Sequence, residues 1–294
     1  MTTWAEVPAG DVNDALSGFL VGLGTSAGDV LERMKGNPKF VSRLVSFARD
    51  GGSPKVGMKV ASTYAYPPEY SGPKPLLEQI KMWKEIFPDL DVEPTVAYIE
   101  GVVPTLKVTA DAEGWFVRPR WKSIADTRHA ALEIILEKIA ASRAFHNYRK
   151  GELGADRLSM HPDTEMAWAL FQREQQGHFD VFPAQYGMRH RGESVLYSRN
   201  AIAERPDEFR MDSFSGSCMA LVHPERYVRS NGLDTDFPGD KYDYPGGDDR
   251  FAYAPFLLFN DELKFGAHHI GVARGSFGSV SGFLPQSYLE SLGS

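Results

Sequence analysis

Apolar positions in the first 176 residues recur mainly at helical spacing. Leu76, Ile80 and Trp83 lie on one face of such a helix, because they are spaced three or four residues apart. The helix is predicted over residues 75–87, since Pro88 cannot continue it. Helices are also predicted over residues 124–148 and 163–176, and residues 1–50 are predicted to form several short helices.

Short apolar runs become more common after residue 177, and they predict strands. Asn260 and Asp261 are typical turn residues between two such runs, so residues 256–265 are predicted to form a hairpin. A short helix is expected from Ser194 to about Ala203, because serine is a preferred N-cap. The other predicted strands are residues 96–108, 115–119, 179–186, 216–222 and 277–284.

These patterns predict an α+β fold, with a helical N-terminal region followed by a β-rich C-terminal domain. Residues 61–75 are rich in proline, glycine and tyrosine, a composition that favours extended backbone and a linker. Four parts follow: a helical N-terminal region (1–60), the linker (61–75), a mixed α/β region (76–154) and a β-rich C-terminal ligand-binding domain (155–294).

Residues 266–276 follow neither the helical nor the strand period, and they lie between two strand-like runs. A patternless loop held between strands is typical of a displayed binding loop. Aromatic walls beside it could come from Tyr242, Tyr244, Phe251 and Tyr253, although the last two fit a hairpin core equally well. The positions expected to contact a ligand are Gly266, His268, His269, Ile270, Gly271, Val272, Arg274 and Ser276.

Five stretches in the last two thirds of the chain resemble a family of uncharacterised bacterial proteins common in candidate-phylum genomes. They are PAQYGMRHRG (183–192), GSCM (216–219), HPER (223–226), FLLFNDELKF (256–265) and GSVSGFLPQ (278–286). The C-terminus also resembles the variable proteins targeted by diversity-generating retroelements. That resemblance implies a C-type-lectin-like domain whose terminal stretch is rewritten at template adenines. Rewritten codons cannot encode Lys, Glu, Gln, Met or Trp, and residues 266–276 contain none of these five.

The composition is that of an acidic globular protein of 294 residues with 42% hydrophobic residues. A formal net charge of -7 argues against nucleic acid as the main partner, and it leaves the ligand and the oligomeric state open. Cys218 is the only cysteine, which excludes an intramolecular disulfide and a four-cysteine zinc site. The sequence has neither a signal-peptide pattern nor an apolar run near the ~20 residues of a membrane span, so the expected location is the cytoplasm.

An acidic stretch, residues 234–249, is a candidate metal site. It carries six aspartates among glycines and prolines, and oxygen ligands on a flexible loop suit Ca²⁺. Counted from Asp234, the stretch partly matches an EF-hand loop, but Pro245 stands where the bidentate glutamate should be. The alternative is a solvated loop whose aspartates form turns. No cofactor other than this Ca²⁺ is expected.

Cys218 with His190 or His223 is a candidate nucleophile–base pair, because a catalytic thiol needs a nearby base. The alternative for Cys218 is a small hydrophobic residue in a core strand. The turn Arg189–Arg191 suits a carboxylate or phosphate ligand, or salt bridges to Asp236 or Asp240.

Adjacent His268 and His269 would project to opposite sides of an extended segment, which makes joint metal binding awkward. The leading hypothesis is therefore a non-enzymatic ligand-binding protein that displays residues 266–276. Its loop should be replaceable with little loss of stability. The alternatives are a structural protein with a large apolar surface patch, or an enzyme whose site lies near Arg189, His190, Cys218, His223 and Asp236.

Overall fold

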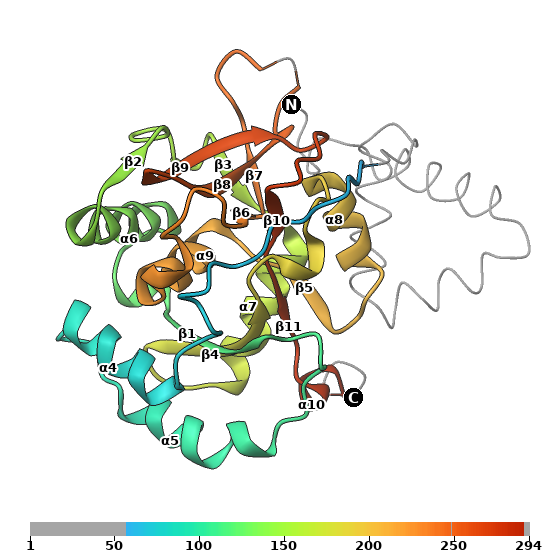
Figure 1. Cartoon of the computed structure of the whole chain (residues 1–294). Coiled ribbons are helices and arrows are strands. Elements are labelled where there is room, and N and C mark those ends of the chain that lie inside the picture. Colours follow the sequence, from blue (N-terminus) through green and yellow to red (C-terminus); the bar gives the residue numbers. More distant parts are fainter. Residues whose placement is uncertain (1–56, 248, 291–294) are drawn as a thin grey trace, which may run out of the picture. The chain divides into compact units, whose positions relative to one another are not determined.

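The computed structural model, shown in Figure 1, describes residues 57–247 and 249–290 of the chain. Helices and two β-sheets occur throughout this part, which confirms the predicted α+β class. The short helices predicted in residues 1–50 lie outside the described residues. Among the described helices, none has both the length and the apolar character that crossing a membrane requires.

The smaller sheet joins strands from the middle of the chain to a strand near its C-terminal end. Its strands are, in spatial order, β1 (Gly114–Pro119), β4 (Phe179–Gln185), β11 (Ser281–Phe283) and β5 (Glu208–Arg210). Each neighbouring pair is antiparallel. The strands predicted at 115–119 and 179–186 are thus confirmed as β1 and β4, and β11 lies inside the sheet instead of at its edge.

The larger sheet is built around a long hairpin, which confirms the hairpin predicted at 256–265. Its strands are, in chain order, β2 (Phe145–Asn147), β3 (Leu158–Met160), β6 (Asp234–Asp236), β7 (Asp240–Tyr242), β8 (Tyr253–Asn260), β9 (Glu262–His269) and β10 (Phe277–Ser279). β8 pairs with β9 along its whole length, and it also pairs with β6 and β7. In Figure 1 this sheet lies in the upper part of the view and the smaller sheet lies below it.

The strand predicted at 277–284 is two short strands that belong to different sheets. β10 runs parallel to β6, whereas β11 pairs with β4 and β5. Val280 lies between them and is fully buried. Its N–H donates to the carbonyl oxygen of Asp236 (3.0 Å), and its own carbonyl oxygen accepts from the N–H of Met211 (3.3 Å). This crossing connects the two sheets covalently and through hydrogen bonds on both sides.

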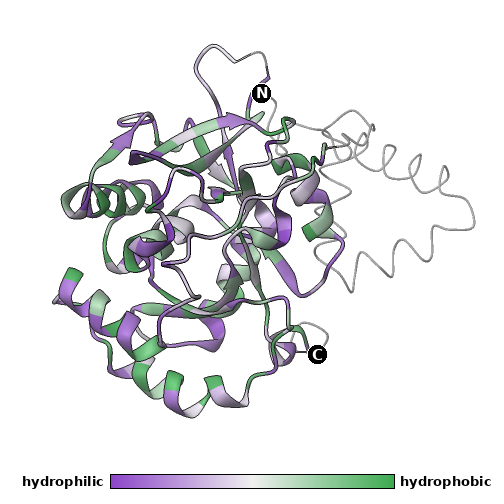
Figure 2. Cartoon of the chain, in the orientation of Figure 1, coloured by the Kyte–Doolittle hydropathy of each residue, from purple (hydrophilic) through white to green (hydrophobic). Residues whose placement is uncertain are grey.

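Helices pack around and between the sheets. They are α4 (Leu76–Ile86), α5 (Glu93–Gly101), α6 (Arg128–Ser142), α7 (Pro162–Glu174), α8 (Val195–Ala203), α9 (Ser213–Val222) and α10 (Gln286–Glu290), with 3-10 helices η3 (Val103–Thr105), η4 (Trp121–Ser123), η5 (Met188–His190) and η6 (Pro224–Arg226). Four predicted helices are confirmed as α4, α6, α7 and α8, although α6 is shorter than 124–148. Figure 2 shows hydrophobic and hydrophilic positions alternating along α4 and α5, as expected of helices with one buried face.

Two segments predicted as strands are helical. Residues 96–108 form most of α5 and then η3, and the buried positions of α5, Thr95 and Ile99, are four residues apart. Residues 216–222 belong to α9, in which every residue is buried. A helix buried on all sides has no polar face, so its sequence lacks the helical period. Asp212 caps its first turn by accepting a backbone hydrogen bond.

The predicted linker is extended, as expected, but it packs along the body of the protein. The N–H of Val60 donates to Gly192 (2.8 Å), and the carbonyl oxygen of Ala65 accepts from Leu233 (2.9 Å). Tyr70 is only 5% exposed. Residues 57–247 and 249–290 belong to one compact unit, and β1 pairs with β4. The described parts of regions 61–75, 76–154 and 155–294 therefore share one core.

Replacing Gly278 with alanine should destabilise the protein by about 1–3 kcal/mol, the usual cost of overpacking. A Cβ at this position would lie 2.1 Å from the carbonyl oxygen of Gly187. Gly278 is held by pairing with β6 and Arg191, and the Gly187 carbonyl oxygen accepts from the His190 N–H. The matched control is Gly101→Ala at the end of α5, where a Cβ would have no atom within 4 Å. Urea denaturation of both variants checks this, and equal midpoints would contradict it.

Candidate functional site

The hairpin extends further towards the predicted loop than the sequence pattern indicates. β9 ends at His269, so Gly266, His268 and His269 are strand residues, and the prediction of a loop from residue 266 is wrong for them. Leu263 and Phe265 are buried on one face of β9, whereas Gly266 and His268 are buried on the other. Because the buried face changes along the strand, the sequence shows no regular alternation.

The side chain of His268 is part of the scaffold and is not displayed. It is 7% exposed, and its Nε2 lies 2.8 Å from Oδ1 of Asp236 on β6. Its ring also packs against Phe256 and Phe277, at centroid distances of 5.2 and 5.0 Å. Gly266 packs against the ring of Phe256: a Cβ at this position would lie 2.5 Å from that ring. Neither position can contact a ligand without rearrangement of the sheet.

The exposed part of the predicted loop begins at His269. Ile270 and Ser276 are half-buried, and their carbonyl oxygens accept from the N–H groups of Leu196 (2.9 Å) and Asp234 (2.7 Å). In contrast, the side chains of His269, Val272 and Arg274 are exposed, with Val272 at 47%. The backbone of this turn is thus anchored at both ends while three side chains point away from the core.

Two half-buried tyrosines, Tyr244 and Tyr253, adjoin this exposed turn through His269. The ring centres of Tyr244 and Tyr253 lie 4.8 Å apart in a stacked arrangement. The ring centres of Tyr253 and His269 lie 5.6 Å apart in a T-shaped arrangement. Gly271, which is half-buried, donates its N–H to Nδ1 of His269 (3.1 Å). Of the other aromatic residues expected here, Tyr242 is fully buried and Phe251 is half-buried. We use the name C-terminal face for Tyr244, Tyr253, His269, Val272 and Arg274.

The acidic stretch 234–249 forms β6, a turn and β7 in its first half, and its aspartates are mostly engaged. Asp240 is fully buried, and its Oδ1 lies 3.0 Å from Nη1 of Arg128. Burial raises the pKa of Asp234 to about 7, although a hydrogen bond from the Phe259 N–H opposes the shift. Within residues 57–247 and 249–290, no group of three or more His, Cys, Asp or Glu side chains could hold a metal ion.

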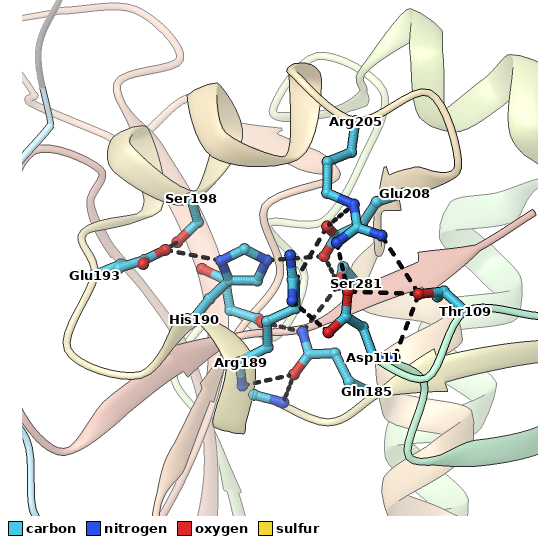
Figure 3. A network of polar contacts seen from close by, with 12 residues as sticks. Thr109, Asp111, Gln185, Arg189, His190, Glu193, Ser198, Arg205, Glu208 and Ser281 are labelled. Carbon is cyan, nitrogen blue, oxygen red and sulfur yellow. Dashed lines mark hydrogen bonds and ion pairs between the residues drawn. The ribbon is translucent and has the colours of Figure 1, made fainter.

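His190 is the centre of a buried network of polar contacts, shown in Figure 3. Its Nδ1 lies 2.8 Å from Oε2 of Glu193, and its Nε2 lies 2.9 Å from Oε1 of Glu208. Two carboxylate partners require both ring nitrogens to donate, which is possible only for the imidazolium ion. Burial lowers the pKa of His190, but the hydrogen bonds to the two glutamates outweigh burial and raise the pKa above its ordinary value.

The two glutamates show the complementary effect. Burial raises the pKa of Glu193 and of Glu208, but contact with His190 lowers each below its ordinary value. Lys59 adds a contact to Glu193 at 2.8 Å, and the hydroxyl of Ser281 donates to Glu208 at 2.5 Å. The cluster therefore holds one buried cation between two buried anions, and it joins η5, β5 and β11.

The outer part of the network involves Arg189, another residue of the predicted basic turn. Nη1 of Arg189 lies 2.8 Å from Oδ1 of Asp111, and its Nε lies 3.3 Å from Oε2 of Glu208. Arg205 pairs with the same aspartate. A salt-bridge role for this turn was one expectation, but the partners are not Asp236 or Asp240. Glu193 follows His190 by three residues, whereas the other acids are distant in sequence and give no local signal.

Cys218 and His223 do not form a nucleophile–base pair. Cys218 lies inside α9 rather than on a strand, and burial raises the pKa of its thiol well above the ordinary value. His223 is fully buried against Phe116 and Tyr70, and burial lowers its pKa. Its Nδ1 lies 3.5 Å from Oε1 of Glu225. Neither side chain has the solvent access that nucleophilic catalysis requires.

The five residues of the enzyme alternative do not converge. Arg189 and His190 share Glu208, but Asp236 contacts His268 instead. Among the described residues, no hydrogen bond or ion pair joins Cys218 to another member of the set. The geometry therefore does not supply the nucleophile, base and orienting group that such a site needs.

Replacing His190 with glutamine should lower the free energy of unfolding by about 3 kcal/mol near pH 6, because it removes the cation that the two buried carboxylates share. This is the lower end of the usual range for breaking a buried ion pair, since Lys59 still contacts Glu193 and Arg189 still contacts Glu208. The pKa of His190 is raised in the folded state, so its contribution is complete below about pH 6.5 and disappears as the pH rises through the folded pKa. The lowered pKa values of the glutamates make their contribution disappear as the pH falls below about 4.5.

The stability difference between the wild type and His190→Gln should thus be largest between about pH 4.5 and 6.5. Chemical denaturation at a series of pH values measures it. His269→Gln is the matched control, because His269 is exposed and has no carboxylate partner in the described part of the chain. A difference that does not change with pH would show that His190 is neutral in the folded protein.

Comparison with known proteins adds no relative to this description: no protein-family model, no curated protein and no solved structure matches the chain. Function must therefore be inferred from the residues and geometry of the chain itself.

Proposed function

We propose that the protein binds a protein or peptide ligand through its C-terminal face and is not an enzyme. The observation that carries the proposal is the change from buried to exposed side chains at the end of β9. Gly266 and His268 are packed within the sheet, whereas His269 at the end of β9 is exposed, as are Val272 and Arg274 in the turn after it. Exposed side chains on a turn that a rigid sheet anchors at both ends are a common arrangement in binding proteins.

The composition of the C-terminal face supports a macromolecular ligand. Tyrosine and arginine are among the residues that contribute most to the binding energy of protein interfaces. Tyrosine buries a large area with few rotatable bonds, and arginine offers many hydrogen-bond donors. Tyr253 is held between Tyr244 and His269, and the guanidinium of Arg149 lies 4.8 Å from the centre of the Tyr244 ring. These rings are ordered before binding, which reduces the entropy lost on association.

A strained residue next to the face also supports the proposal. Phe251 has a φ of 60°, a left-handed conformation that costs a bulky residue roughly 1–3 kcal/mol. The guanidinium of Arg250 lies 4.9 Å from the centre of its ring. Such strain is retained where surrounding contacts impose it, and it occurs preferentially at functional sites.

The retroelement class and the C-type-lectin-like architecture belong to the same proposal. A diversified segment needs fixed positions that hold the fold and replaceable positions that contact the ligand. The end of β9 and the turn after it offer both kinds. The enzyme alternative receives less support, because its candidate residues lie in separate environments.

The triple variant His269→Ala, Val272→Ala, Arg274→Ala should lose ligand binding and keep its stability. Exposed side chains that make few contacts change the free energy of unfolding by no more than about 0.5 kcal/mol each. The probe is a phage-displayed library of random dodecapeptides, selected against the immobilised wild type. Selected peptides are then tested on the variant, and we expect their affinity to fall at least about tenfold, or 1.4 kcal/mol.

The matched control is Leu77→Ala, because Leu77 is 48% exposed on α4, outside the C-terminal face. It should bind the selected peptides as the wild type does. Failure to enrich any peptide, or enrichment of peptides that bind the triple variant equally well, would refute the proposed face. A second comparison, His268→Ala, should destabilise the protein, since that side chain is buried.

The DNA next to the gene provides an independent prediction. If the segment is diversified, a near-copy of the codons for residues 260–286 should lie close to a reverse-transcriptase gene and differ at adenines only. The differences should fall on codons for exposed positions such as 269, 272 and 274. Codons for Gly266, His268 and Gly278 should match, because these positions are packed against other residues. A neighbourhood without such a copy would remove the retroelement part of the proposal.

A further inference from the structure

Two adjoining cavities lie beside η4, and none of the residues that line them belongs to the C-terminal face or the His190 network. Their volumes are about 370 and 280 Å³, near the lower end of the range for ligand pockets. Trp121, Lys122 and Gln172 line both of them. The cavities therefore form one continuous site between the end of β1 and α7.

The lining of this site is cationic although the whole chain is acidic. Glu165 is the one acidic residue in the lining of the two cavities. The cations are Arg118, Arg120, Lys122 and Arg128. Three of them pair with carboxylates of Asp180, Asp212 and Asp240, which are fully buried and do not line either cavity. The lining thus contains the cationic partner of each pair, whereas the carboxylates are not part of it.

The buried acids also fix the geometry of the cations. Nη2 of Arg118 lies 3.0 Å from Oδ2 of Asp180, and its guanidinium lies 3.4 Å from the centre of the Trp168 ring. The indole N–H of Trp168 in turn donates to Oδ2 of Asp212 (2.7 Å). Arg118 is 1% exposed, and its Nε has no hydrogen-bond partner among the described residues. Arg118 therefore contributes a fixed, buried positive charge to the wall of the smaller cavity.

Two donors at the cavities are more accessible. Lys122 is exposed, its Nζ lies 5.3 Å from the centre of the Trp121 ring, and it has no ion-pair partner in the part of the chain that the structure describes. Nδ1 of His178 accepts from the N–H of Asp91 (3.0 Å), so a neutral ring carries its hydrogen on Nε2. The larger cavity therefore combines Lys122 and His178 with Arg120, whereas the smaller one adds the apolar surfaces of Met160 and Trp168.

From this arrangement we propose that the site binds a small phosphate ester that carries a planar ring, of the nucleoside monophosphate class. The phosphate occupies the larger cavity near Arg120, Lys122 and His178, because clustered cationic donors suit a dianionic group. The ring lies in the smaller cavity against Trp121, where stacking on an indole contributes to affinity.

Isothermal titration calorimetry with adenosine 5′-monophosphate tests the proposal directly. The full-length wild type should bind it saturably, with adenosine and inorganic phosphate each binding at least about tenfold more weakly. Lys122→Glu should weaken binding at least about tenfold, since it reverses the one exposed and unpaired cation in the lining. Because Lys122 is exposed, this variant should fold as the wild type does.

Lys81→Glu is the matched control, because Lys81 is exposed on α4 and does not line either cavity. It should bind adenosine 5′-monophosphate as the wild type does, and so should the triple alanine variant of the C-terminal face. No saturable binding at millimolar concentration would overturn the proposal, as would equal affinity of the wild type and Lys122→Glu. Equal affinity for inorganic phosphate would overturn the part played by the ring.

Discussion

The passage of residues 277–283 from one sheet to the other is the constraint on which the rest of the fold depends. Gly192 donates its N–H to the carbonyl oxygen of Phe277 (2.8 Å), and the Gln185 amide donates to that of Ser279 (2.8 Å). After Val280, residues 281–283 form β11 and fill the space between β4 and β5. Without this segment the smaller sheet would be split, and the turn before β10 would lose its second anchor.

Buried charge serves the same purpose in this protein: it connects segments that are distant in sequence. His190 links η5 to Glu208 on β5, and Arg128 at the start of α6 reaches Asp240 on β7. Removing charged groups from water is costly, so such pairs add little net stability compared with apolar packing. Their consequence is specificity, because a misplaced segment would leave a buried charge without its partner.

Local sequence patterns predict the elements that have one buried face, and they fail where burial is complete or changes side. α4 and the β8–β9 turn follow the expected spacing, so both are predicted correctly. α9 is buried all round, and its small and apolar residues resemble a core strand. β9 changes its buried face between Phe265 and Gly266, which conceals its second half. In the candidate site, His190 is noticeable as part of a basic turn, but its partner Glu208 is brought close only by the sheet.

The same reasoning explains how an acidic chain can present a cationic site. Net charge governs long-range attraction and the binding of long polyanions, because it sums over the whole surface. The local field in a cavity depends instead on which partner of each pair faces the solvent. Beside η4 the carboxylates of Asp180 and Asp212 are fully buried, while Arg120 is 17% exposed. An overall charge of -7 therefore argues against a nucleic-acid polymer, and it is compatible with a single small anion bound at this site.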